Sequence, residues 1–108
     1  MTIKSLVSEI NQINQFLNKS YPDGTRPEAI FARMVKIQEE LGEFADEVLA
    51  NLNFQRRDKA SKYDHSSLSK EWADVLLAHL VLAVCLNLDI ENIIKDRLNQ
   101  IKNRYQIK

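Results

Sequence analysis

The sequence predicts an all-α fold, a four-helix bundle formed as a single domain by residues 1–108. Only two glycines and two prolines are present, which leaves few positions for the many turns of a β architecture. Apolar residues recur at intervals of three and four along most of the chain, which is the period of an amphipathic helix. The mass of 12.5 kDa is that of one domain.

Two helices are predicted in the first half of the chain. The first runs from about residue 3 to 18 and ends at Tyr21-Pro22-Asp23-Gly24. Thr25 and Glu28 have the spacing of a capping box, so a second helix is expected from about residue 26 to 52. Its predicted apolar face consists of Ile30, Met34, Ile37, Leu41, Phe44, Val48 and Leu52.

Two more helices are predicted after a connecting loop over residues 53–69, which has no apolar period. The third helix is expected to begin at Ser67 or Ser69 and to end near Leu86. The fourth, capped by Asp89, is expected to run from about residue 90 to 105.

The third helix is apolar on nearly all sides, since only Asp74 and His79 are polar between Trp72 and Leu86. This run is shorter than the roughly 20 apolar residues of a membrane span, so it predicts a core helix with His79 in the core, and no membrane partner. Three other short helices cannot cover it fully. We therefore expect a homo-oligomer, a dimer or a tetramer, that associates through the apolar helices.

Charge and cysteine content limit the classes of function. Lys plus Arg and Asp plus Glu both number 15, and the resulting net charge of zero argues against a dedicated nucleic-acid binder. The single cysteine, Cys85, excludes an internal disulfide and is expected to pack as a small hydrophobe. Together with the lack of an apolar leader-like run, this favours a cytoplasmic location.

An acidic stripe is predicted along the second helix, facing away from its apolar side. It spans an arc of about 120° and contains Glu39, Glu40, Glu43, Asp46 and Glu47. Residues 37–52 include no Lys or Arg that could form the (i, i+4) pairs that usually stabilise such a face. Something positive should therefore offset these carboxylates.

A second acidic pair lies at the start of the third helix, where Glu71 and Asp74 share a face. Asp74 is followed by apolar residues, and a carboxylate in such surroundings is costly unless it is paired or binds a metal. If the two acidic helices face each other, four oxygen ligands for Mg²⁺ or Mn²⁺ result: Glu40, Glu43, Glu71 and Asp74.

The fourth helix is basic, with Lys95, Arg97, Lys102 and Arg104 against only two acids. Taken alone, this is equally well a solvated face that suits the helix C-terminus. Beside a metal site, the same cations become a candidate clamp for polyphosphate.

The segments Glu39-Glu40-Leu41-Gly42-Glu43 and Glu71-Trp72-Ala73-Asp74 resemble the paired acidic motifs of the MazG-like all-α nucleoside triphosphate pyrophosphohydrolases. The resemblance implies a MazG-like bundle that hydrolyses an NTP or dNTP to the monophosphate and pyrophosphate, with water activated by carboxylate-bound Mg²⁺. It implies metal ligation by the same four carboxylates. Catalytic roles fall to Glu39, Glu40 and Glu43, with Glu39 a further ligand or the base.

The resemblance also implies substrate-binding residues on the fourth helix. Two registers fit, one with Lys95, Asn99 and Lys102 and the other with Arg97 and Arg104. Two alternative functions stay open, a phosphoribosyl-ATP pyrophosphatase-like enzyme and a non-catalytic helical regulatory module.

Overall fold

The computed structural model describes residues 1–21, 23–52 and 65–108, and it contains four helices and no strand in these ranges. They are α1 (Ile3–Ser20), α2 (Arg26–Asn51), α4 (His65–Cys85) and α5 (Ile90–Arg104). The all-α prediction is confirmed. The predicted loop lies mostly outside the described residues, but α4 begins at His65, so Ser67 and Ser69 lie inside the helix and do not cap it.

The helix ends follow local hydrogen bonding. The Thr25 hydroxyl caps α2 by accepting from the backbone N–H of Glu28 at 3.3 Å, as expected. Asp89 occupies the N-cap position of α5 without a capping bond, because its carboxylate accepts from the Asn92 side chain at 2.7 Å. After α4, Asn87 adopts a left-handed φ of 57° that lets the chain turn sharply toward α5.

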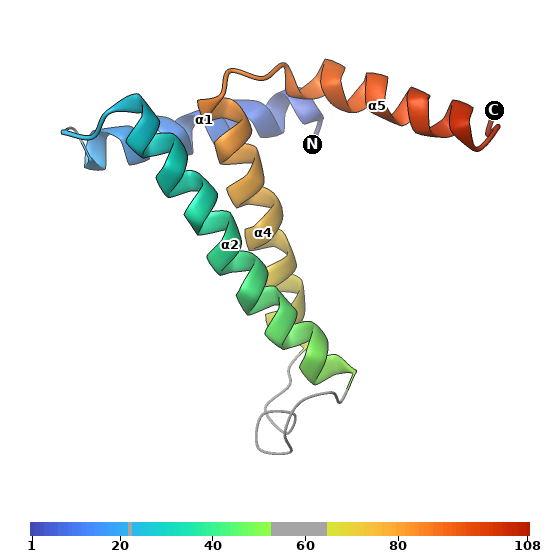
Figure 1. Ribbon diagram of the computed structural model, residues 1–108, viewed down its shortest axis with the longest axis horizontal. Helices are drawn as coiled ribbons and strands as arrows, with labels where there is room; N and C mark the ends of the chain where they lie inside the picture. Colours follow the sequence, from blue (N-terminus) through green and yellow to red (C-terminus); the bar gives the residue numbers. More distant parts are fainter. Residues whose placement is uncertain (22, 53–64) are drawn as a thin grey trace.

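The helices form an open arrangement in one chain. In Figure 1, α2 and α4 lie side by side in opposite directions, α1 crosses one end of this pair, and α5 extends away from it. The radius of gyration is 17.1 Å, whereas a compact domain of this length has about 13 Å. The pair α2 and α4 therefore dominates the packing, and much helix surface has no neighbour among the described residues.

The core lies where α1 and the end of α4 meet the beginning of α5. Its buried side chains are Ile10, Leu80, Val81 and Ile90. His79 is exposed, so its predicted place in the core is wrong. Cys85 is half-buried, and its thiol also donates to the Asn14 side-chain oxygen at 2.9 Å.

The buried side of α2 matches the predicted apolar face only in part, since that face keeps these residues half-buried: Ile30, Ile37, Phe44 and Val48. Arg33 and Glu40 are buried, whereas Met34 and Leu41, from the predicted apolar face, are exposed. Apolar residues surround much of α2, so their period alone does not select a face. The exposed large apolar side chains on this helix are Phe31, Met34, Val35, Leu41 and Leu49.

No single helix in the described ranges is both long and apolar enough to cross a bilayer. The segments Ser67–Cys85 and Ile90–Arg104 satisfy the length and composition test only together, across a bend of 113°.

Candidate metal centre

Three carboxylates meet between the two longest helices. Glu40 and Glu43 lie one turn apart on α2, and Glu71 lies on the facing part of α4. One oxygen from each lies within 4.8 Å of the other two. The sequence prediction that acids of the two helices converge is therefore matched by the geometry for these three residues.

Two oxygens of this acidic group are buried without a hydrogen-bond partner among the described residues. Glu40 is only 8% exposed, and no donor in the described ranges reaches its Oε2 atom. The Oε2 atom of the half-buried Glu71 is likewise buried, and no donor among the described residues bonds to it. A buried carboxylate oxygen without a donor is costly, and a cation would satisfy it. The oxygen-only donor set fits a hard divalent cation such as Mg²⁺ or Mn²⁺.

Mutual repulsion is visible at Glu43. The negative charge of Glu40 raises the pKa of the Glu43 carboxyl, and desolvation and the neighbouring Glu71 and Glu39 raise it further. A divalent cation acts in the opposite sense, since it favours the ionised carboxylates.

Two lysines supply part of the positive charge that the sequence required. Lys36 lies 3.0 Å from Glu40 and 3.5 Å from Glu39. Lys36 stands one residue before the interval 37–52, which lacks Lys and Arg. It forms an (i, i+4) pair with Glu40, so the expectation that the acidic stripe has no such pair is wrong for this residue. Lys70 lies 3.1 Å from Asp74 and 3.7 Å from Glu71. Both lysine side chains are more than half exposed, so these pairs stabilise the fold little.

The other predicted acids surround this group. Asp74 is not one of the three clustered carboxylates, and its side chain is 35% exposed, so the deep burial expected for it is found at Glu40 instead. Glu39 is exposed beside Lys36. Asp46 is exposed and Glu47 half-buried, one to two turns further along α2.

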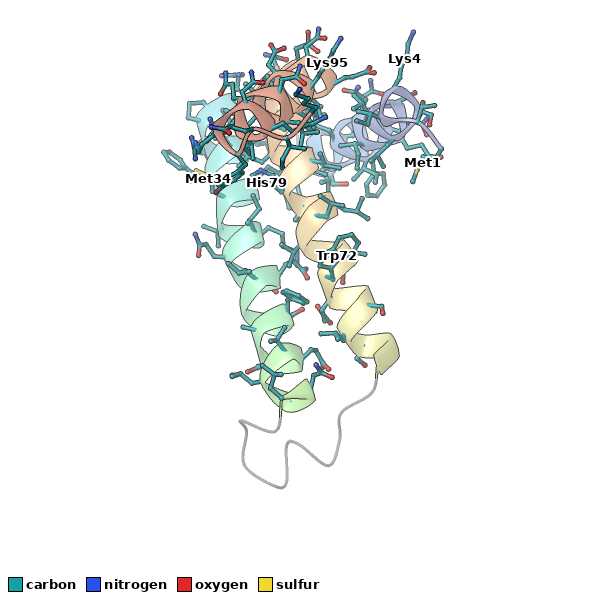
Figure 2. The ribbon with its side chains drawn as sticks, turned by 90° about the vertical axis from the view of Figure 1, so that its right-hand side faces the viewer. Met1, Lys4, Met34, Trp72, His79 and Lys95 are labelled. Atoms are coloured by element: carbon teal, nitrogen blue, oxygen red, sulfur yellow. The ribbon has the colours of Figure 1, made fainter. Side chains whose placement is uncertain are left out.

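The predicted substrate-binding residues lie elsewhere in the chain. Figure 2 shows Lys95 at the end where α1 and α5 lie, whereas Trp72, which follows Glu71, lies further down α4. The whole group on α5 is exposed: Lys95, Arg97, Asn99, Lys102 and Arg104. Within one chain, α5 therefore does not bring these side chains to the carboxylates, and their role stays a prediction.

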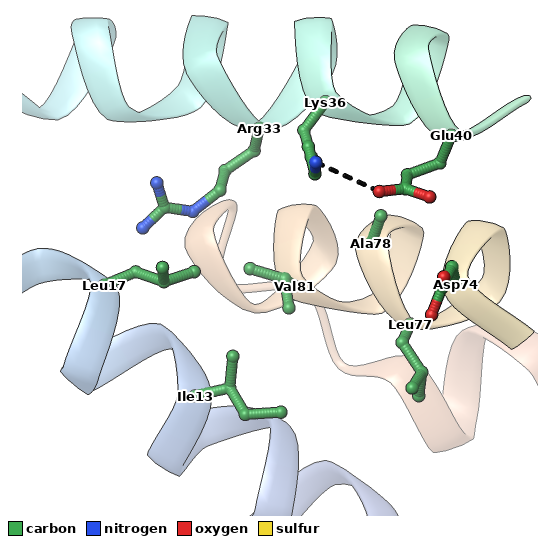
Figure 3. A pocket seen from close by; sticks show the side chains of 9 residues that line it. All are labelled: Ile13, Leu17, Arg33, Lys36, Glu40, Asp74, Leu77, Ala78 and Val81. Carbon is green, nitrogen blue, oxygen red and sulfur yellow. Dashed lines mark ion pairs between the residues drawn. The ribbon is translucent and has the colours of Figure 1, made fainter. Parts of the chain in front are cut away.

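Two other cations, which the sequence analysis did not single out, lie beside the acidic group. Arg33 and Lys36 of α2 line a cavity of about 270 Å³ between α1, α2 and α4 (Figure 3). Glu40 and Asp74 line the same cavity. The sequence did contain one signal, since Lys36 precedes Glu40 by four residues, but the burial of Arg33 depends on where α1 crosses.

Comparison with known proteins identifies the family. Neither the curated proteins nor the solved structures include a match to this chain. The family described as the MazG nucleotide pyrophosphohydrolase domain matches residues 30–107, which include both acidic segments and the cations beside them. With its helices, its paired acids and most of its length accounted for, the chain belongs to the MazG nucleotide pyrophosphohydrolase domain family.

Proposed function

We propose that this chain, as a MazG nucleotide pyrophosphohydrolase, cleaves an NTP or dNTP between the α- and β-phosphates to give the monophosphate and pyrophosphate. The observation that carries this proposal is the group formed by Glu40, Glu43 and Glu71, which meet within 4.8 Å and leave two buried oxygens without donors. Such a group is costly to fold unless a cation is bound.

The proposed metal ligands are Glu40, Glu43 and Glu71, with Asp74 beside them on the next turn of α4. Bound Mg²⁺, or Mn²⁺, would supply charge neutralisation for the phosphate oxygens and a lowered pKa for the attacking water. Glu39, exposed next to Glu40, is our candidate to orient or deprotonate that water. Glu40 and Asp74 also line the cavity between α1, α2 and α4, so that cavity adjoins the proposed ligands.

A homo-oligomer is part of the proposal. The open chain leaves large apolar side chains exposed on α2, α4 and α5, among them Leu41, Trp72 and Leu98. Large apolar side chains left exposed in such number favour association with another surface. A second copy is the proposed partner that covers it.

A pyrophosphate-release screen tests the activity. All eight common NTPs and dNTPs are assayed with Mg²⁺ and with Mn²⁺, and turnover of at least one substrate is expected. Glu43→Gln should remove this turnover, and Glu9→Gln, which changes an exposed glutamate on α1, should not. Uniform inactivity would reject the enzyme proposal and favour the non-catalytic regulatory module.

A further inference from the structure

We propose that Arg33 and Lys36 form a phosphate-binding subsite beside the candidate metal centre. The ligand is one phosphate group of the nucleotide's phosphate chain. This inference rests on the proposed function and assigns phosphate binding to cations of α2, which lie next to the carboxylates in the same chain.

Arg33 is a buried cation that has no anionic partner in the part of the chain that the structure describes. It is 9% exposed, and its side chain extends from α2 toward α1 along the cavity in Figure 3. Its Nη2 atom donates only to the neutral side-chain oxygens of Asn18 at 3.1 Å and Asn14 at 3.4 Å. Its Nε atom is buried, and no acceptor from the described ranges lies within hydrogen-bond distance. A buried guanidinium normally pairs with a carboxylate or a phosphate, and among the described carboxylates none lies within ion-pair distance.

Lys36 lies one turn after Arg33 and lines the same cavity. Its ammonium group lies 3.0 Å from the Oε1 atom of Glu40, and its side chain is 53% exposed. Glu40 is also a proposed metal ligand. When a divalent cation neutralises Glu40, that carboxylate attracts Lys36 less strongly, and the ammonium group becomes available to an anion in the cavity.

The size of the cavity limits what it can hold. About 270 Å³ lies below the range of roughly 300–1,000 Å³ for pockets that enclose a whole drug-sized ligand. Arg33 and Lys36 also line a larger hollow of about 1310 Å³ that extends along the ends of α1 and α4. A phosphate held by the two cations can therefore remain attached to a larger molecule.

Calorimetric binding to the full-length chain tests the inference. Mn²⁺ is titrated first, and pyrophosphate or a nucleoside monophosphate is then titrated in the presence of Mn²⁺. Lys36→Gln and Arg33→Gln should each weaken binding of at least one phosphate probe by about tenfold or more, as expected for the loss of a charge-assisted hydrogen bond. The affinity for Mn²⁺ alone should be unchanged or higher in Lys36→Gln, because the lysine no longer competes for Glu40.

Matched variants separate charge from folding. Lys36→Arg and Arg33→Lys keep the charge and should restore part of the phosphate affinity. Lys4→Gln removes an exposed lysine on α1 (Figure 2) and should change nothing. Because Lys36 is largely exposed, its variant should fold and carries the test even if Arg33→Gln does not.

The two phosphate probes assign the position in the chain. Weakening confined to pyrophosphate places the subsite on the leaving-group side, and weakening confined to the monophosphate places it at the α-phosphate. Wild-type affinity for both probes in Lys36→Gln and Arg33→Gln overturns the inference alone. A wild-type chain that binds neither Mn²⁺ nor pyrophosphate overturns the proposed function, and the subsite with it.

Discussion

Replacing Glu71 with glutamine should stabilise the metal-free protein and remove its response to divalent cations. Glu71 and Glu40 both have largely buried side chains, and their oxygens lie within 4.8 Å. At an effective dielectric constant of about 20, two such charges repel by about 3.5 kcal/mol. The salt bridge from Lys70 recovers little of this because that lysine is mostly exposed. We expect Glu71→Gln to raise the free energy of unfolding by about 1–3 kcal/mol.

The cation response supplies the second half of this test. In the wild type, a divalent cation at a concentration 100 times its dissociation constant should stabilise the fold by about 2.7 kcal/mol. Glu71→Gln removes one of the three clustered carboxylates that we propose as ligands, so most of this increment should disappear. The variant should therefore gain free energy of unfolding without metal and lose the stabilisation that a divalent cation gives. Both changes are expected if Glu71 binds the cation and is repelled by Glu40 when the cation is absent.

The assay is urea denaturation at fixed protein concentration, with EDTA and then with MgCl₂ or MnCl₂, followed by circular dichroism. Glu9→Gln is the matched control and should leave both measurements unchanged, since it removes an exposed glutamate outside the acidic group. A clear loss of apo stability in Glu71→Gln would refute the reasoning, because it would show that Glu71 belongs to a structural ion network.

Three other predictions follow from the same geometry. Glu43→Gln or Asp74→Asn should lower the kcat for pyrophosphate release by at least about 10², and unchanged turnover would reject the assigned site. In EDTA, the free energy of unfolding of the wild type should fall as pH rises from about 4.5 through the raised pKa of Glu43, because the folded state binds that proton more tightly than the unfolded state. Denaturation midpoints measured across this pH range should show the decline, and Glu43→Gln should lack it. Light scattering at low micromolar concentration should give a mass above 12.5 kDa, and a Leu41→Lys variant should move it toward that value.

The helices and the acidic group were predictable because both depend on short sequence spacings. Glu40 and Glu43 lie three residues apart, and a helix places such residues on adjacent turns whatever it packs against. To place Glu71 beside these two residues, one further assumption was needed, namely that the third predicted helix packs against the second. In the structure α2 and α4 do pack against each other. The family match over residues 30–107 agrees with this reading.

The burial of individual residues was less predictable, because it depends on how helices rotate against each other. Leu41 was expected inside and Glu40 outside, yet the structure reverses them. Since α4 is apolar on nearly all sides, it accepts either face of α2, and apolar period gives no preference. The predicted burial of His79 was wrong for a related reason: α4 has few neighbouring helices, so one of its sides remains exposed to solvent.

The burial of Arg33 could not be predicted from net charge or helix composition. The four basic residues of α5 made it the candidate phosphate-binding helix, and within the chain α5 extends away from the α2 and α4 pair (Figure 1). Arg33 lies in a helix that contains many acidic residues, so the net charge of that helix does not indicate a site for an anion. Its burial arises because α1 crosses α2 at the level of Asn14 and Asn18, whose amides are the only acceptors that it finds among the described residues. Neutral acceptors leave the charge of a buried guanidinium unbalanced. Because Arg33 lines the same cavity as the proposed metal ligand Glu40, the anion that we propose to balance it is a phosphate group bound together with the divalent cation.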